Sequence, residues 1–342
     1  MYLNNKGSVF KVLLENKNIS RADISRLLHL NKPSVSRIVQ ELIDDGWVVE
    51  KKLVDSNSKV GKNPILLNLN RNKKILGIQI NEFKSTFIIS DLYGDISHKE
   101  IIQIRSGKYF KEDFDNSLRM IKNKYKYNFV AISIVLPGII NHSVIHFSYD
   151  LNIKDFDITY ISKEIFPDIP LFLENDSRAA ALSEKNFSDV GLKDFFYVLF
   201  KVDYKNSILY VGSSFIIHNE IVRGFNNFAG EIIDLSYTDD GIKHIKVHND
   251  LTWEMDEKLS SVILKELGRL FVFLNPEKVI FGGNISQEKS GFIEKTEEMI
   301  ERLKNDYYTY DVSFAVSKIK NPVELGTVAV VIDKLKNSEF RF

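Results

Sequence analysis

The sequence predicts an α/β protein in which a small winged helix-turn-helix domain precedes a larger, two-lobed α/β body. Two observations predict this order. Residues 8–43 carry apolar side chains at helical spacing, and an alternating stretch with a polar, basic tip follows them. From Lys74 onward the spacing becomes that of strands, and a layout of strand, turn, strand, turn and strand occurs twice. A cleft between two such lobes is the usual place for a ligand.

Charge is divided unevenly along the chain. The formal net charge is zero, but residues 1–72 hold 12 Lys and Arg against 7 Asp and Glu, and the remainder carries the compensating negative charge. A basic end on an acidic body indicates that only the N-terminal part meets a polyanion.

Composition excludes several classes of protein. The 342 residues suit two or three domains, and 44% hydrophobic residues can form real cores. The absence of cysteine excludes disulfides, thiolate nucleophiles and cysteine-ligated zinc. No apolar run has the roughly 18 residues of a membrane span, and the N-terminus lacks the apolar core of a signal peptide. We therefore expect a cytoplasmic protein without a membrane partner.

Three helices are expected in the first 46 residues. Val9 to Leu14 form one apolar stripe, and Ser20 with Asp23 forms a capping-box-like start for the second helix. Pro33 suits the first turn of the third helix, and Gly46 is a typical C-terminal stop.

The third helix is expected to enter a major groove, and the hairpin at 47–67 to form a wing with a basic tip over the phosphates. The polar face of the third helix offers hydroxyl, guanidinium and amide groups for phosphates and base edges. The predicted DNA-binding residues are Lys32, Ser34, Ser36, Arg37, Gln40, Lys59 and Lys62. The alternative is a small helical bundle with a solvated basic face. The order of helix, turn, helix and wing favours the DNA-binding interpretation.

The body begins with strands at 75–80 and 86–90 and a turn at 93–95. Its second copy is expected as strands at 196–202, 207–211 and 215–217. We expect domains at residues 1–72, 73–176 (joined by a C-terminal helix at 322–342) and 177–321.

The whole chain resembles the ROK family, which groups sugar-responsive repressors with bacterial sugar kinases. Short runs in the same order and spacing carry the resemblance. They are Ile19 to Ser25, Asn31 to Arg37, Gly61 to Pro64, Pro137-Gly138, Glu174-Asn175-Asp176, Arg223-Gly224, Ala229-Gly230-Glu231, Asn275-Pro276, Phe281-Gly282-Gly283 and Leu325-Gly326.

The resemblance implies an actin-like, ribonuclease-H-like body. Asp176 matches the catalytic base of the kinases, and Asn175 and Glu231 match sugar-binding positions. Asp150 falls where the family usually has Asn, and Asp234 where it has a zinc-binding His. The predicted ligand-binding residues are Asp150, Asn175, Asp176, Glu231 and Asp234. An equally weighted alternative makes Asp176 only the N-cap of the following helix.

The departures from the family pattern predict a loss of catalysis. The first phosphate-binding turn has Asn81-Glu82-Phe83 in place of Gly-Gly-Thr, and Gln79 in place of Asp. The second turn, at 203–206, also lacks its glycines. The zinc-binding His and cysteines are missing, and His244 and His248 alternate along a strand-like stretch with a lysine between them. We therefore expect no catalytic residue, no metal and no cofactor.

The sequence favours a cytoplasmic transcriptional regulator and, of the two kinds, a repressor over an activator. Its partners are expected to be double-stranded operator DNA, a sugar or sugar-derivative effector, and a second copy of the chain in a homodimer (or a dimer of dimers). Two alternatives stay open: an active ATP-dependent sugar kinase with an appended DNA-binding domain, and a DNA-binding protein that needs no ligand.

Overall fold

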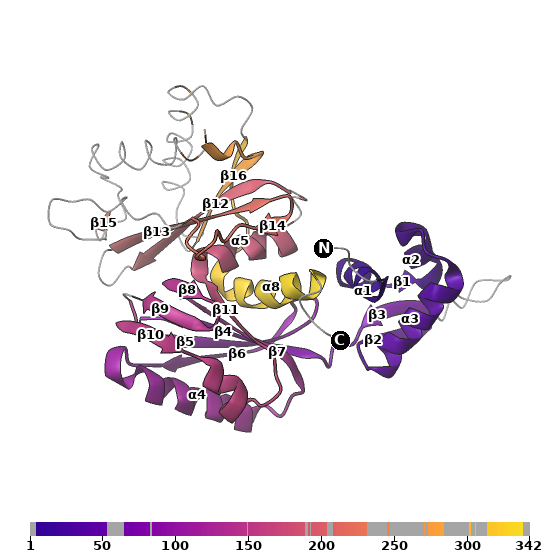
Figure 1. Ribbon diagram of the computed structural model, residues 1–342, viewed down its shortest axis with the longest axis horizontal. Helices are drawn as coiled ribbons and strands as arrows, with labels where there is room; N and C mark the ends of the chain where they lie inside the picture. The colour runs from indigo at the N-terminus through magenta and orange to yellow at the C-terminus, as the bar shows by residue number, and fades with distance from the viewer. Residues whose placement is uncertain are drawn as a thin grey trace.

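The computed structural model describes residues 5–52, 65–82, 84–148, 150–188, 191, 193–203, 208–230, 245–246, 270, 273–283, 301, 305 and 313–337. Figure 1 shows a small N-terminal domain beside a body of two lobes, with the last helix lying between the two sheets of the body. The tip of the wing, with Lys59 and Lys62, lies outside the described residues.

The N-terminal domain has the predicted three helices and wing. Its elements are α1 (Asn5–Glu15), β1 (Ile19–Ser20), α2 (Arg21–Leu28), α3 (Lys32–Asp44), β2 (Val48–Lys52) and β3 (Ile65–Leu69). The expected capping box of Ser20 and Asp23 is confirmed. Asn31, which was not predicted as a cap, accepts a hydrogen bond from the backbone N–H of Ser34, while Gly46 takes a φ of 73° just beyond α3. The strand β1, also unforeseen, pairs with β3 in a sheet of order β1-β3-β2.

The first lobe is a five-stranded sheet of order β11-β7-β4-β5-β6. One small antiparallel sheet, β10-β9-β8, lies at its edge, and α4 covers one face of the large sheet. Its elements are β4 (Lys74–Asn81), β5 (Lys84–Asp91), β6 (Ile96–Gln103), α4 (Phe110–Lys124), β7 (Phe129–Leu136), β8 (Ile139–Asn141), β9 (Val144–Ser148), β10 (Ile153–Asp157) and β11 (Leu171–Asn175). The predicted strands at 75–80 and 86–90 are confirmed, with the turn at Tyr93-Gly94 between β5 and β6.

The second lobe begins with α5 (Asp176–Phe187) and contains a sheet of order β14-β13-β12-β16-β17, with β15 paired to β13. Its strands are β12 (Phe195–Asp203), β13 (Ile208–Ile217), β14 (Glu220–Ile221), β15 (Ile245–Lys246), β16 (Lys278–Gly283) and β17 (Ser313–Val316). The chain then returns through α8 (Pro322–Lys336).

One strand prediction in the second lobe was wrong. The expected separate strands at 207–211 and 215–217 are a single strand, β13, whose residues 208–216 pair with β12. The small residues Gly212, Ser213 and Ser214 suggested a turn, but they let β13 lie directly against α5. A Cβ on Gly212 would come within 3.0 Å of the Ser177 side chain, and the Ser214 hydroxyl donates to the Ser177 carbonyl.

The helices α5 and α8 lie together between the two sheets (Figure 1). They cross closely because Gly326 has no side chain: a Cβ there would lie 2.5 Å from the carbonyl oxygen of Ala179. On its other side α8 packs on β4, where a Cβ on Gly77 would meet the side chain of Thr327. The last turns of α8 share a continuous apolar core with the N-terminal domain. We propose the domain boundaries at residues 72 and 176, with α8 belonging to the first lobe.

Candidate DNA-binding surface and effector cleft

The polar face of α3 is open to solvent. Lys32, Ser36, Arg37 and Gln40 are exposed, and Ser34 is half-buried near the start of the helix. The guanidinium of Arg37 donates to Glu41 at 2.8 Å, and the amide of Gln40 donates to Asp44 at 2.9 Å. Pairs of this kind, one turn apart on an exposed helix, are weak, so both side chains can turn to DNA at little cost.

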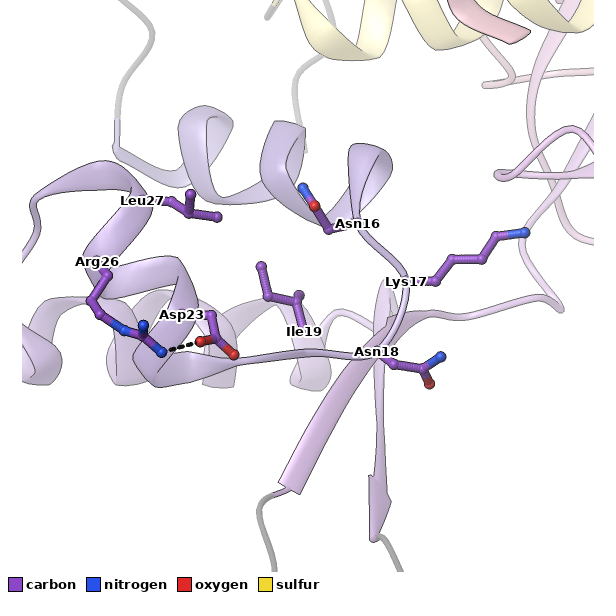
Figure 2. A pocket seen from close by; sticks show the side chains of 7 residues that line it. All are labelled: Asn16, Lys17, Asn18, Ile19, Asp23, Arg26 and Leu27. Atoms are coloured by element: carbon purple, nitrogen blue, oxygen red, sulfur yellow. Dashed lines mark hydrogen bonds and ion pairs between the residues drawn. The ribbon is translucent and has the colours of Figure 1, made fainter. Parts of the chain in front are cut away.

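The N-terminal domain also carries an open groove between the end of α1 and α2 (Figure 2). Its lining combines the basic side chains of Lys17 and Arg26 with the exposed apolar side chain of Leu27. Arg26 is already paired with Asp23. The groove belongs to the surface of this domain and not to the space between the lobes.

The ligand-binding region predicted between the two lobes, here called the cleft, is represented in the described residues by the junction of β11 and α5, where Asn175 and Asp176 lie. Asn175, which was predicted to bind ligand, caps α5: its side-chain oxygen accepts from the backbone N–H of Ser177 at 2.8 Å and from that of Arg178 at 3.4 Å. Its side-chain NH₂ donates to the carbonyl of Gly138 at 3.0 Å. Asn175 thus connects the first turn of α5 with the turn after β7. The alternative that Asp176 is the N-cap was wrong, because Asp176 is the first residue of the helix itself.

Asp176 is paired with a lysine. Its Oδ2 atom accepts a hydrogen bond from Lys201 Nζ at 2.5 Å, and the two side chains are 10% and 23% exposed. Burial would lower the pKa of Lys201, but the charges of Asp176 and the half-buried Asp150, with the hydrogen bond to Asp176, raise it. Lys201 therefore stays protonated. Its ammonium group contacts the carboxylate of Asp176, the residue that matches the catalytic base of the kinases.

An ion pair network next to Asp176 is centred on the buried Glu174. The carboxylate of Glu174, only 5% exposed, accepts from Arg178 Nε at 2.6 Å and from Arg223 Nη2 at 2.7 Å. Burial alone would raise the pKa of Glu174, but the two guanidinium groups outweigh burial and lower it to about 2. Because Arg223 follows β14, this network joins the start of the second lobe to the loop at 223–230.

The same loop bridges the two lobes. Asn227 donates from its side chain to the side-chain oxygen of Asn141 in the first lobe at 2.7 Å. Its backbone carbonyl accepts from Arg178 at 3.1 Å. At the end of the loop, the carbonyl of Gly230 accepts from the Ser213 hydroxyl at 2.7 Å. Polar groups from both lobes thus converge around the N-terminus of α5, as expected of a site for a polar ligand.

Comparison with known proteins agrees with this architecture. A model of the MarR family matches residues 8–54, and a model of the ROK family matches residues 75–243. This chain carries a MarR-type winged helix domain followed in the sequence by a ROK family domain.

Similarity extends over nearly the whole chain. The sequence is 27% identical to a xylose repressor of Caldicellulosiruptor bescii, over 97% of this chain and 96% of that protein. The fold resembles the crystal structure of a ROK family transcriptional regulator, a homologue of E. coli MLC protein, with a TM-score of 0.74, 19% identity and 98% of each chain covered. It also resembles a putative N-acetylmannosamine kinase from Listeria monocytogenes, with a TM-score of 0.60, 16% identity, and 78% of this chain and 99% of the other covered.

The segment predicted to replace the first phosphate-binding turn of the kinases carries polar side chains. Gln79 is nearly buried, and its amide donates to the side-chain oxygen of Asn81 at 3.5 Å. Glu82 is half-buried. Of the second predicted turn at 203–206, Asp203 ends β12, and residues 204–206 lie outside the described residues, as do Phe83, Glu231, Asp234, His244 and His248.

None of the helices in the described part of the chain is both long and apolar enough to cross a membrane. Among the same residues, no group of three or more His, Asp or Glu side chains is arranged to hold a metal ion.

Several cleft residues were missed by sequence reasoning. Lys201, Arg223 and Asn227 reach the cleft through contacts between segments 25 to 86 residues apart in the chain, which no local pattern shows. Glu174 and Arg178 did leave a signal. They are only four residues apart, at the end of β11 and in the first turn of α5, so their opposite charges are close to each other in the sequence.

Proposed function

We propose that this protein is a transcriptional repressor that binds operator DNA through α3 and the wing. The exposed polar face of α3 on a basic domain carries this part of the proposal. The xylose repressor that resembles the chain over almost its full length supports it. The protein acts in the cytoplasm as a homodimer, because two recognition helices about 34 Å apart read successive major-groove faces of a two-fold symmetric site.

We further propose that the ROK domain binds a sugar or sugar derivative and has no kinase activity. The pairing of Asp176 with Lys201 carries this part. A base that accepts a proton from a sugar hydroxyl must be available to it, and an ammonium 2.5 Å away competes for the same lone pairs. The half-buried Glu82 in the first phosphate turn adds negative charge where polyphosphate would need donors.

Substitution of Arg37 by alanine tests the DNA-binding surface. Because phosphate and base-edge contacts dominate such interfaces, we expect Arg37→Ala to weaken specific binding by about 1–3 kcal/mol, measured by fluorescence anisotropy on a DNA fragment selected by the wild-type protein. Arg105→Ala is the matched control, because Arg105 is also exposed and ion-paired, with Asp113, but lies on the first lobe. Unchanged affinity of the Arg37 variant would remove this residue from the DNA-reading face.

Thermal-shift screening tests the effector cleft. A panel of pentoses and hexoses that includes D-xylose should contain a sugar that raises the melting temperature of the wild type. Asp176→Asn should abolish this shift, since an NH₂ donor replaces one carboxylate oxygen and leaves a ligand hydroxyl without its acceptor. Asp155→Asn is the control: Asp155 is an exposed carboxylate outside the cleft with a φ of 47° that asparagine tolerates.

The same sugars with ATP and magnesium should yield no sugar phosphate above background. Turnover of any of them would establish the kinase alternative. A screen in which no sugar shifts the melting temperature would instead favour a DNA-binding protein that works without an effector.

A further inference from the structure

The helix α5 connects the cleft with the DNA-binding domain. Its first residue is Asp176, and its last turn carries Lys185, Asn186 and Phe187. A helix of 12 residues is about 18 Å long at 1.5 Å per residue. Helices are rigid secondary elements and can carry coupling between groups at their two ends.

Buried polar contacts lock the far end of α5 to α8. Lys185 Nζ lies 2.5 Å from Asp333 Oδ1, and these side chains are only 5% and 3% exposed. One turn later, Lys336 Nζ donates to the side-chain oxygen of Asn186 at 3.0 Å. Separating a buried ion pair leaves an uncompensated charge, so a movement of α5 on α8 that parts Lys185 from Asp333 is strongly unfavourable.

The same lysine of α8 reaches the DNA-binding domain. Lys336 Nζ lies 3.8 Å from the carboxylate of Glu15, the last residue of α1. Around this pair, Leu335 and Ile332 of α8 share one apolar core with Val9 and Leu13 of α1. Figure 1 shows the C-terminal end of α8 directed at α1.

A second connection runs through the turn between β5 and β6. Phe187 at the end of α5 packs so closely on Gly94 that a Cβ there would lie 2.5 Å from the ring. The neighbouring Tyr93 accepts a hydrogen bond on its hydroxyl from the backbone N–H of Leu69, at the end of the wing strand β3, at 2.8 Å. Both connections begin in the last turn of α5 and end on the DNA-binding domain.

We propose that the C-terminal turns of α5 and α8, with Lys336 as the attachment point on Glu15, set the orientation of the winged helix domain according to the state of the cleft. This proposal rests on the proposed function for its biological meaning, because it describes how effector binding would be read by the DNA-binding domain. Its structural content is independent of DNA and sugar: a change of charge at the N-terminus of α5 changes the orientation of the winged helix domain, and Lys336 is needed for that response.

Pulsed electron paramagnetic resonance on the full chain measures this orientation directly. The chain has no cysteine, so Ala22→Cys and Asn116→Cys, both at exposed positions, place one spin label on α2 and one on α4. Labelled protein is diluted with unlabelled protein so that only distances within one chain contribute. We expect one narrow distance distribution that moves or broadens in Lys336→Met and in Glu15→Gln.

Lys99→Met is the matched control. It removes an ion pair of the same type, Lys99 with Glu324 at 2.6 Å, but at the opposite end of α8 and within the body. We expect its distance distribution to equal that of the wild type. A distribution unchanged by Lys336→Met, or changed as much by Lys99→Met, would overturn the assignment of Lys336.

Lys201→Met tests whether the cleft affects this orientation, because it removes the positive charge next to Asp176 without any ligand. We expect it to move the distribution in the wild-type background and to have no further effect beside Lys336→Met. If Lys201→Met leaves the distance distribution unchanged in both backgrounds, or changes it equally in both, the state of the cleft does not reach the winged helix domain through α5, α8 and Lys336. Since neither arm contains DNA or sugar, failure here is distinguishable from failure of the repressor function.

Discussion

Replacing Glu174 by alanine should lower the free energy of unfolding by about 3–5 kcal/mol, because it leaves a buried charge without its partner. The Arg178 side chain is only 1% exposed, and its guanidinium Nε donates to Glu174 at 2.6 Å. Without the carboxylate, Arg178 and Arg223 both lose the negative charge that they contact. Chemical denaturation followed by circular dichroism measures the loss.

Glu100→Ala is the control for this experiment. Glu100 forms an ion pair with Lys124 on the surface of the same body, and such a pair contributes little. A loss in Glu174→Ala no larger than in Glu100→Ala would contradict the proposed importance of the buried network.

The pH dependence of the free energy of unfolding provides a second test of the Glu174 network. The folded-state pKa of Glu174 is about 2, against an ordinary value of 4.5. A carboxylate with a lowered pKa contributes stability that is complete above its ordinary pKa and is lost as the pH falls toward the folded-state value. The wild type should therefore lose stability between about pH 4.5 and pH 2 more steeply than Glu174→Gln.

Replacing Asp333 by alanine should have an effect of similar size, again about 3–5 kcal/mol, because Lys185 would be left buried and unpaired between α5 and α8. Thermal and chemical unfolding of the full chain measure it. The double variant Lys185→Met with Asp333→Leu should recover most of the loss, since apolar side chains of similar volume replace the pair without a buried charge. A double variant as unstable as Asp333→Ala would show that shape, and not charge, decides this contact.

Sequence reasoning recovered those parts of the fold that local spacing encodes. The three helices of the first domain follow from apolar side chains three and four residues apart, and the capping box at Ser20 is written in four consecutive residues. The strands β4 and β5 follow from continuous apolar runs bounded by turn residues. Each of these features depends on neighbours in the chain, which is why a single sequence shows them.

The parts that were missed depend on residues far apart in the chain. The run Gly212-Ser213-Ser214 has the composition of a turn, but its small side chains serve the packing of β13 on α5, which only the folded chain reveals. Asn175 and Asp176 are adjacent, and both residue types cap helices, so composition could not decide which of them caps α5. Lys201 has no local signal at all, because its partner Asp176 lies 25 residues away.

Selection of DNA fragments from a random-sequence library by the full-length protein tests the central claim most directly. The account predicts enrichment of a two-fold symmetric motif whose half-sites lie about 10 base pairs, or a multiple of that, apart. Binding to this motif should weaken steeply with salt, as expected when phosphate contacts dominate. It should also weaken in the Arg37→Ala variant. Fragments that remain random after repeated rounds, or a motif bound equally well by Arg37→Ala and the wild type, would contradict the assignment of α3 as the element that reads DNA.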